Sequence, residues 1–450
     1  MTTRTQAVFS YLSLFLISVF SASSAVADEI PPAPTLDKGD TAWMIVSTAL
    51  VLMMTIPGLA LFYGGLVRKN NVLATIMQSF TICCIAAVLW PVIGYTLAFA
   101  EGNGFVGGME RLFLRGLEKD TLLAGLTIPE SVFVMFQFTF AAITAAIIMG
   151  SVADRIKFSA LLLFTPLWLL AVYSPVAHWV WGPGGIIGGI GVENFSGILG
   201  FGAALDFAGG TVVHINSGIA GLVLAMVIGK RSDYGKTQYL PHNLVLSSIG
   251  ASMLWVGWFG FNAGSAVAAD GRAGMAMLVT NSAAAAAALT WIIIELAHRG
   301  KASVLGGLSG AVAGLVVITP ASGFVGFEAS LVMGIIGSAA CYFAVSTLKA
   351  RFKYDDSLDA FGVHGIGGVV GAVLTGVFAS SAIGGSAGLL EGNSNQLVAQ
   401  IISVVVTAVY SGVVTYILAK IVDATVGLRV DKESEIMGLD ISMHGESVHS

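Results

Sequence analysis

The chain has 450 residues, of which 56% are hydrophobic and only 10% are charged, and its formal net charge at pH 7 is −5. A soluble globular protein carries about 25% charged residues, so this composition excludes an ordinary soluble enzyme and indicates a membrane protein. The acidic balance also argues against nucleic acid as a partner.

The first 27 residues have the pattern of a secretory signal peptide. Arg4 supplies a positive charge, residues 7–20 form an apolar stretch that is short for a membrane span, and Ala25-Val26-Ala27 is a cleavage sequence of the A-x-A type. We therefore expect residues 1–27 to be removed, which leaves residues 28–41 as a periplasmic N-terminus. An uncleaved first helix is the alternative.

Eleven apolar stretches follow, each close to the roughly 20 residues that a membrane-spanning helix needs. They are residues 42–67, 72–100, 131–152, 158–180, 208–229, 243–262, 274–297, 302–320, 327–349, 361–381 and 396–422. Lysine and arginine are concentrated in alternate loops and in the tail, and positive loops normally stay in the cytoplasm. This pattern predicts an all-α membrane domain over 42–422 with the N-terminus outside and a cytoplasmic tail, 423–450.

Aromatic residues cluster near the predicted outer ends of three spans. The third span carries Phe136 and Phe140, the fourth ends at Trp181, and the sixth ends with Phe261 and Ser265. A belt of aromatic residues at the membrane surface is one interpretation. The other is a site in which aromatic faces hold a cation while a hydroxyl group accepts its protons.

Two histidines lie inside apolar stretches in the same local pattern, V-H-x-x-x-G-x-x-G. They are His214 and His364, on the fifth and tenth spans. Because each half then holds an odd number of spans, the pattern predicts two inverted five-helix repeats with a shared site near the midplane, and an eleventh helix as a brace. The repeated glycines are best explained by close helix packing.

An ionisable side chain in the membrane is costly and usually serves a function, although structural hydrogen bonding is the alternative. Buried without a counter-charge, both imidazoles should be neutral, with one donor and one acceptor each. They could share a hydrogen bond and still bind a small polar ligand or relay a proton. No third metal ligand and no soluble-enzyme motif accompanies them, so we expect no metal, no cofactor and no catalytic residue.

Three acidic residues stand near the ends of spans. Asp206 precedes the fifth span, where it can cap the helix and add negative potential at the outer mouth. Asp359 precedes the tenth span and is expected to do the same on the inner side. Glu295 lies near the inner end of the seventh span and is interpreted as an interfacial residue.

Several ordered strings resemble the ammonium transporter, methylammonium permease and Rhesus family, and the resemblance extends from about residue 40 to 446. The strings are 206–216 (DFAGGTVVHIN), 257–265 (GWFGFNAGS), 361–365 (FGVHG) and, in the tail, 426–430 (VGLRV). The resemblance implies a homotrimer with one pore in each subunit and uptake of ammonium across the inner membrane. Residues 192–203 look longer than in common bacterial members.

The resemblance also implies roles for individual residues. An outer recruitment site for ammonium corresponds to Phe136, Phe140, Trp181 and Ser265. A stacked phenyl gate corresponds to Phe140 and Phe261, twin pore histidines correspond to His214 and His364, and a supporting family aspartate corresponds to Asp206. The implied mechanism is loss of a proton at the outer site, passage of ammonia through an apolar pore, and separate transfer of the proton.

The tail and the inner loops resemble the surface on which PII signal proteins block the pore. Two other functions stay open: an ammonium sensor that transports little, and a channel for another small neutral gas such as carbon dioxide. A sensor is less expected because only residues 423–450 follow the last span, and the complete outer site argues against a gas channel. An intramembrane enzyme lacks a nucleophile beside the two histidines.

Overall fold

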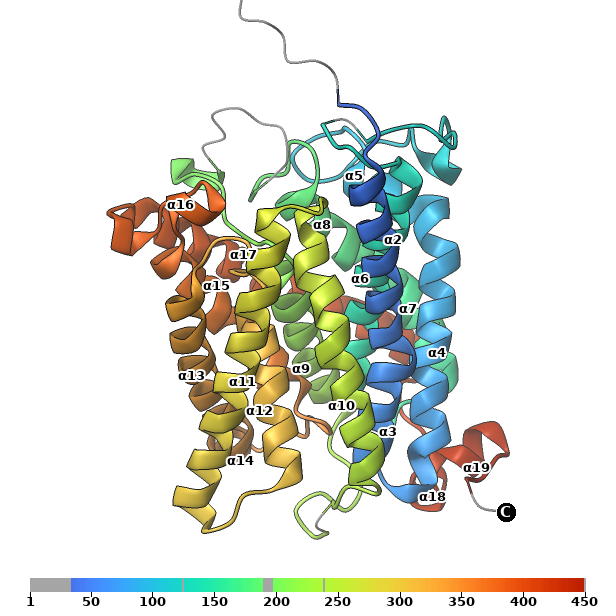
Figure 1. Cartoon of the computed structure of the whole chain (residues 1–450). Helices are drawn as coiled ribbons and strands as arrows, with labels where there is room; N and C mark the ends of the chain where they lie inside the picture. The colour runs from blue at the N-terminus through green and yellow to red at the C-terminus, as the bar shows by residue number, and fades with distance from the viewer. Residues whose placement is uncertain (1–33, 124, 189–196, 238, 449–450) are drawn as a thin grey trace, which may run out of the picture. The chain divides into compact units, whose positions relative to one another are not determined.

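The protein is a bundle of helices that run side by side (Figure 1). The computed structural model describes residues 34–123, 125–188, 197–237 and 239–448. The predicted signal peptide, 1–27, lies outside these ranges, and so do residues 192–196 of the segment 192–203 that looks longer than in common bacterial members.

The described residues contain eleven apolar helices, as the sequence predicts. Ten have at least 18 residues, and the eighth, Val304–Ile318, has 15. The others are Lys38–Leu66, Lys69–Phe99, Glu130–Gly150, Phe158–Trp181, Gly210–Ile228, Leu244–Ala266, Gly271–Arg299, Phe327–Phe352, Phe361–Phe378 and Ser394–Thr425. Helices satisfy their own backbone hydrogen bonds, which lipid cannot do, so the chain is a multi-pass membrane protein.

The first ten helices form two halves of five. The first half is α2 (Lys38–Met53) with α3 (Ala60–Leu66), α4 (Val72–Leu89) with α5 (Tyr95–Phe99), α6 (Glu130–Gly150), α7 (Phe158–Trp168) with α8 (Ser174–Trp181), and α9 (Asn216–Ile228). The second half is α10 (Leu244–Trp258), α11 (Gly271–Arg299), α12 (Val304–Ile318), α13 (Phe327–Phe343) with α14 (Lys349–Phe352), and α15 (Ile366–Phe378). In Figure 1, α2 and α3 run from the upper to the lower end and α10 runs the opposite way, so the halves are inverted. The long α17 (Ser394–Thr425) is the eleventh helix and packs against α7, α9 and α15.

Polar side chains determine where several helices begin. The Asn243 side chain accepts hydrogen bonds at the start of α10, and Ser303 accepts one from the Gly306 amide at the start of α12. Glu295, interpreted from the sequence as an interfacial residue, is a buried side chain whose carboxylate accepts hydrogen bonds from the Ser303 amide and hydroxyl. This contact joins the end of α11 to the start of α12.

Wider, π-helical turns interrupt or begin several spans, and such turns often occur at functional sites. Three of them carry residues that the sequence singled out. His214 lies in Gly210–Ile215, Phe261 in Phe259–Ala263 and His364 in Phe361–Gly365. The helix is therefore locally irregular at His214, Phe261 and His364.

The repeated glycines pack the two histidine turns against each other, as predicted. A Cβ atom added at Gly218 would overlap the backbone of Gly365, and one added at Gly368 would lie 2.9 Å from the Gly210 carbonyl oxygen. These contacts are reciprocal: each glycine follows one histidine by four residues and touches the other half. The helix backbones approach closely only because these side chains are absent.

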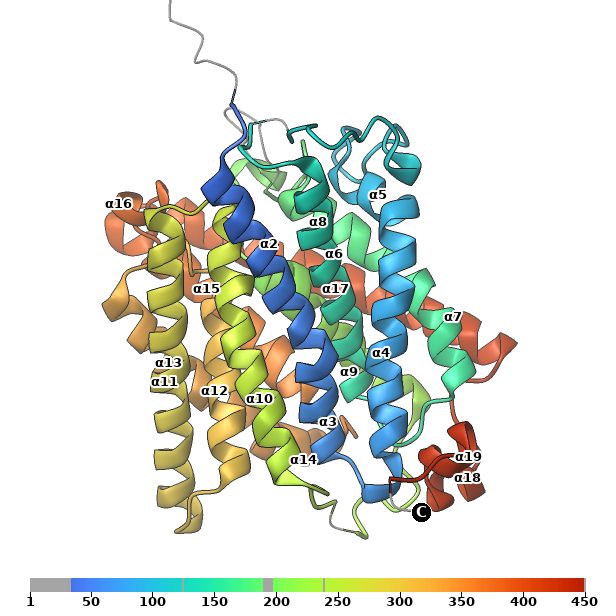
Figure 2. The ribbon, with the colours of Figure 1, turned by 45° about the vertical axis from the view of Figure 1, so that its right-hand side comes forward.

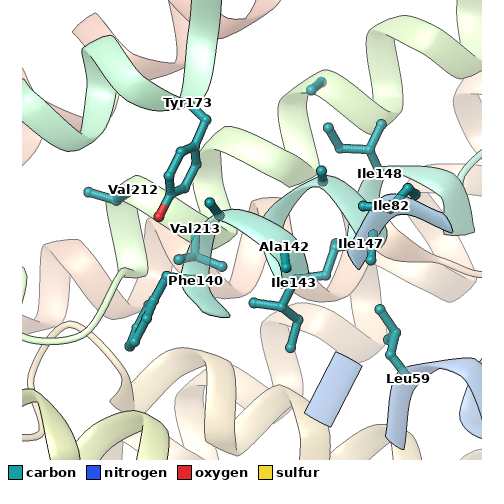
Figure 3. Close-up of a cluster of buried hydrophobic side chains, with 14 of the residues drawn as sticks. Leu59, Ile82, Phe140, Ala142, Ile143, Ile147, Ile148, Tyr173, Val212 and Val213 are labelled. Atoms are coloured by element: carbon teal, nitrogen blue, oxygen red, sulfur yellow. The ribbon is translucent and has the colours of Figure 1, made fainter. Parts of the chain in front are cut away.

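The third span, α6, lies at the centre of the bundle. Almost every residue from Phe133 to Gly150 is buried, and a helix that is apolar all round is a buried helix. Figure 3 shows part of this packing, in which the α6 residues lie among side chains from other spans. The labelled residues are Leu59, Ile82, Phe140, Ala142, Ile143, Ile147, Ile148, Tyr173, Val212 and Val213. Packing on all sides fixes the position of Phe140.

The tail folds against one end of the bundle. It contains α18 (Lys432–Met437) and α19 (Leu439–His444), which lie beside the lower ends of α3 and α4 in Figures 1 and 2. The Ala74 amide at the start of α4 donates a hydrogen bond of 2.8 Å to Asp440. The tail is thus part of the packed structure.

Candidate functional site

Four rings form a continuous column through the centre of the bundle. The ring centroids of Phe140 and Phe261 are 4.3 Å apart, those of Phe261 and His214 are 6.0 Å apart, and those of His214 and His364 are 5.2 Å apart. We call these residues the ring column. All four rings are buried, and they come from α6 and from the three π-helical turns. The structure therefore brings the predicted gate and both predicted pore histidines into one line.

The two histidines face each other through their Nδ1 atoms, which are 3.2 Å apart. When both imidazoles are neutral, one Nδ1 carries the hydrogen and the other accepts it. The ring that donates from Nδ1 then has an acceptor at Nε2, and its partner has a donor at Nε2. The Nε2 atom of His214 is buried and has no hydrogen-bond partner among the described residues. The pair can thus offer one acceptor and one donor to a small polar molecule.

Trp258 supports the outer histidine, although sequence reasoning gave it no role. Its ring stacks on His214 at a centroid distance of 5.5 Å, and its Nε1 donates to the Thr319 hydroxyl at 2.8 Å. It belongs to α10, so its ring holds His214 from the other half of the molecule. The G-W-F-G-F string contains this residue, but contact with a distant histidine leaves no local pattern.

The predicted recruitment residues gather above the ring column. The ring centroids of Phe136 and Trp181 lie 4.9 and 5.7 Å from that of Phe140, and the Trp181 ring stands nearly perpendicular to it at 88°. The hydroxyl of Ser265 donates to the Phe261 carbonyl at 2.8 Å. The adjacent Gly264 packs closely against the Phe136 ring. We call Phe136, Phe140, Trp181 and Ser265 the outer cluster.

Asp206 caps the helix that carries His214, as one of the two interpretations predicted. Its carboxylate accepts hydrogen bonds from four consecutive amides, those of residues 209–212, at 2.7–3.1 Å. Its backbone carbonyl accepts a bond of 2.8 Å from Trp181 Nε1. The side chain is buried, so Asp206 links the outer cluster to the His214 turn.

On the inner side the corresponding residue is Asp356, not Asp359 as the sequence suggested. The Asp356 carboxylate accepts from the amides of Ala360 and Phe361 at 3.2 and 2.8 Å, at the start of the His364 turn. Asp359 instead forms an ion pair of 2.6 Å with Lys349. The spacing could have identified Asp356, because it precedes its histidine by eight residues, as Asp206 does.

The ring column ends at a cavity of about 820 Å³ on the side of the tail, and His364 is one of its lining residues. Apolar, aromatic and charged side chains line this inner cavity together, and the charged ones distinguish it from the ring column. The charged side chains include Arg68, Asp154, Lys230, Arg231, Lys349 and Asp359. His364 thus lies where the buried rings meet a cavity that also contains charged side chains.

A buried group of charges borders the inner cavity. Arg231 donates to Asp355 at 2.6 and 3.0 Å and to Asp154 at 3.1 Å, and its guanidinium lies 3.7 Å from the centroid of the Tyr239 ring. Arg155 is fully buried and donates to the Asp355 carbonyl at 2.6 Å. We call Asp154, Arg155, Arg231 and Asp355 the inner clasp. It joins the end of α6 to the segment that leads into the His364 turn.

The tail reaches this region through Glu435. Its carboxylate accepts from the amide and hydroxyl of Ser232 at 2.8 and 2.9 Å and from Arg429 at 2.7 Å, and its carbonyl accepts from Arg68 at 2.9 Å. Burial raises the pKa of Glu435, but the hydrogen bonds from Arg429 and Ser232 outweigh it and hold the pKa below its ordinary value. Because Ser232 follows Arg231 in the chain, the tail and the inner clasp are directly connected.

Metal binding has no visible basis in the part of the chain that the structure describes. Within those residues, no group of three or more His, Cys, Asp or Glu side chains is arranged to hold a metal ion. The candidate site therefore consists of the outer cluster, the ring column and the inner cavity.

Comparison with known proteins bears on this site. A model of the Ammonium Transporter Family matches residues 42–449. The ammonium transporter of Bacillus subtilis is 50% identical over 416 residues, which cover 92% of this chain and 99% of that protein. The ammonium transporter of Aquifex aeolicus is 48% identical over 440 residues, covering 97% and 98%.

Solved structures agree with the sequence comparison. The crystal structure of Saccharomyces cerevisiae Mep2 superimposes with a TM-score of 0.79 at 34% identity over 89% of both chains. A structure titled Sensor Amt Protein superimposes with a TM-score of 0.81 at 27% identity, over 90% of this chain and 98% of that one. The resemblance seen in the sequence is confirmed, and the chain belongs to the ammonium transporter family.

Proposed function

We propose that this protein takes up ammonium selectively across the inner membrane. The observation that carries the proposal is the ring column, which joins an aromatic cluster on one side to a polar cavity on the other through two facing histidines. Each part suits one step in the passage of a cation that can become neutral by losing a proton.

Recruitment takes place at the outer cluster. Aromatic faces attract a cation, and this attraction is worth about 0.5–2 kcal/mol depending on how dry the site is. Phe136, Phe140 and Trp181 supply the faces, and Ser265 supplies a hydroxyl oxygen that can accept a hydrogen bond from an ammonium N–H. Potassium gains the same attraction from the rings but has no N–H to donate.

Deprotonation follows because the ring column is hostile to ions. Phe140 and Phe261 are in contact and fully buried, and moving an unpaired charge into such surroundings is very costly. Ammonium can separate into ammonia and a proton, so that the neutral molecule enters alone when the rings move apart. Potassium cannot become neutral and is rejected. The proton crosses separately.

The twin histidines then conduct ammonia. A neutral pair that shares the Nδ1–Nδ1 hydrogen offers one Nε2 acceptor and one Nε2–H donor. Ammonia can use both, which offsets the loss of its hydration in the column. Beyond His364 it reaches the inner cavity and takes up a proton again.

A second candidate is an ammonium sensor that transports little. It is favoured by the structural likeness to the protein titled Sensor Amt Protein. The same pore geometry would serve sensing, because the outer cluster can bind ammonium whether or not the ion proceeds. Transport measurements separate the two functions, as binding measurements cannot.

The surrounding organisation is part of the proposal. We infer that residues 1–27 are removed, that 28–41 face the periplasm, that 42–422 span the inner membrane and that 423–450 lie in the cytoplasm. We also infer a homotrimer and a PII partner at the inner face, and membership in the family supports both inferences. The packed tail and the charged inner cavity support an interaction surface at that end. Chemical cross-linking tests the trimer, and co-purification with a PII protein tests the partner.

The deciding experiment records currents from liposomes that contain the purified protein and receive pulses of ammonium or potassium. We expect a current with ammonium only. In the His214→Ala/His364→Ala variant this current should disappear or be joined by potassium leakage. His242→Ala is the matched control, because it removes a histidine outside the spans and should change nothing. Silence in both pulses, with ammonium binding intact, would indicate a sensor or an electroneutral channel.

A further inference from the structure

We propose that Asp356 is a positioning residue that holds His364 in register with His214, as Asp206 does from the other side of the pore. The proposal rests on the proposed function only in its transport readout. Asp356 lies outside the ring column and the outer cluster. Its role would be to cap the helical turn that carries His364.

Asp356 and Asp206 occupy equivalent positions in the two inverted halves. Each precedes its histidine by eight residues, and each lies a few residues before a π-helical turn that contains the histidine. The two halves are otherwise dissimilar in sequence here, since 206–213 reads DFAGGTVV and 356–363 reads DSLDAFGV. Apart from the valine of the histidine motif, the aspartate is the one residue that the two strings share, which indicates a shared task.

The hydrogen bonds show what the task is. The first amides of a helix have no partners within the helix, and a carboxylate at that place satisfies them. The Asp356 carboxylate accepts hydrogen bonds from the amides of Ala360 and Phe361, one on each oxygen. The side chain is fully buried, so water cannot substitute for it. His364 follows within the same turn, and its ring direction depends on where that turn starts.

The neighbours of Asp356 are themselves held firmly. Arg231 binds the Asp355 carboxylate at 2.6 Å, and Arg155 binds both the Asp355 carbonyl and the Ser357 hydroxyl at 2.6 Å. The backbone on both sides of Asp356 is thus tied to the inner clasp. The cap can therefore transmit a fixed position to the turn that carries His364.

The opposite side of the His364 turn is closely packed. The Gly365 backbone lies against Gly218, close enough that an added Cβ atom at Gly218 would overlap it. A hydrogen bond between ring nitrogens weakens steeply once the distance exceeds about 3.5 Å. Since the Nδ1 atoms are already 3.2 Å apart, a small displacement of the His364 turn is enough to break their contact.

The test compares Asp356→Ala and Asp356→Asn with the native protein in lipid bilayers. Solid-state 15N spectra of histidine-labelled protein report the shared N–H···N bond, and thermal unfolding reports stability. Ammonium and potassium currents are recorded on the same samples. Asp270→Asn is the matched control, because Asp270 also caps a helix, α11, which carries no residue of the ring column or the outer cluster.

We expect the N–H···N signature to disappear in Asp356→Ala and the ratio of ammonium to potassium current to fall at least about fivefold, in line with loss of a helix cap. Asp356→Asn keeps one acceptor and should recover part of both readouts. The control should keep the native spectrum and ratio.

A folded Asp356→Ala protein with an unchanged histidine spectrum would overturn the proposal. So would a spectrum that changes equally in Asp270→Asn, because general loosening would then explain it. If the native protein shows the N–H···N bond but carries no ammonium current, the proposed function fails while the positioning role stands. The two failures are therefore distinguishable.

Discussion

The outer and inner ends of the ring column are related by the inverted repeat but are anchored by different chemistry. At the outer end, uncharged groups hold the segment before the histidine turn: Trp181 donates to the Asp206 carbonyl and Gln400 of α17 bonds the Leu205 backbone. At the inner end, the charged clasp holds the same place, with Arg231 on Asp355. Uncharged groups thus hold the segment before the His214 turn, whereas charged groups hold the segment before the His364 turn.

The difference follows the environment of each end. The outer anchor adjoins the aromatic outer cluster through Trp181, where the proposed function requires ring faces that no fixed cation occupies. The inner anchor borders a polar cavity and, through Ser232 and Glu435, contacts the tail. Among the described residues, the inner half is therefore the one that is connected to the packed tail. Variants that damage one end and spare the other make this comparison testable.

The largest effect is expected from Asp206→Ala. Four buried amides would lose their acceptor, and each buried unsatisfied group costs about 1–3 kcal/mol, so the loss of stability should reach about 4 kcal/mol or more. Thermal unfolding in detergent measures it. Asp37→Ala, which removes an exposed cap at the start of α2, should cost at most about 1 kcal/mol. Equal losses in both variants would contradict the special role of Asp206.

Arg231→Lys should damage the inner end by about 2–3 kcal/mol, because a lysine cannot replace the paired bonds to Asp355, the bond to Asp154 and the stacking on Tyr239 together. The charge remains, so the effect should stay below that of Asp206→Ala. Thermal unfolding measures the loss of stability, and the rate of proteolysis of the tail measures how firmly the tail is packed against the inner end. Ammonium binding at the outer cluster should be unchanged; weaker binding there would mean that the two ends are not independent.

Most of the fold was predictable from the sequence, because the bilayer imposes a simple rule on the chain. Eleven apolar stretches gave eleven helices, with ends that agree within four residues. The eighth helix is shorter than its predicted stretch, 302–320, because Ser303 caps its start and Pro320 cannot continue it. The histidine pattern also predicted the inverted repeat.

The site was predictable only where a local pattern recorded it. His214 and His364 share a motif, and their contact follows from the repeat. Trp258 was missed because its partner, His214, is distant in the sequence. Asp356 was missed because another acid, Asp359, stands closer to the histidine turn. Contacts that exist only after folding leave no local pattern, and the repeat spacing was the one clue available.

Gly218→Ala and Gly368→Ala compare the two histidine turns directly. The added methyl group at Gly218 would lie only 2.3–2.4 Å from the Gly365 backbone. At Gly368 the overlap is milder, because the Gly210 carbonyl oxygen and two Ile215 atoms lie 2.9–3.0 Å away. We expect a destabilisation of about 1–3 kcal/mol, larger for Gly218→Ala. Gly274→Ala is the control, because no atom lies within 4 Å of its added methyl group and it should be neutral or stabilising by up to about 1 kcal/mol. Thermal unfolding that ranks Gly368→Ala as the more damaging would contradict the inferred packing.

The smallest effect is expected at the tail, from Glu435→Gln. Its carboxylate makes charge-assisted bonds to Arg429 and Ser232, but Arg429 is partly exposed and water screens the pair, so the loss should be about 1–2 kcal/mol of tail docking. Protection of residues 423–446 from hydrogen exchange measures it. Glu433→Gln removes the same charge from an exposed neighbour and is the matched control.

The pH dependence sharpens this prediction. Burial raises the pKa of Glu435, but the Arg429 and Ser232 hydrogen bonds lower it below the ordinary value of 4.5. A group with a lowered pKa contributes stability above its ordinary value and loses it as the pH falls through the lowered one. Docking should therefore stay constant from pH 8 to roughly pH 5 and weaken only below that, and this acid-induced weakening should be smaller in Glu435→Gln. Since the tail packs at the inner end, acid should release it there while ammonium binding at the outer cluster persists. A simultaneous loss of both would show that the two ends titrate as one unit.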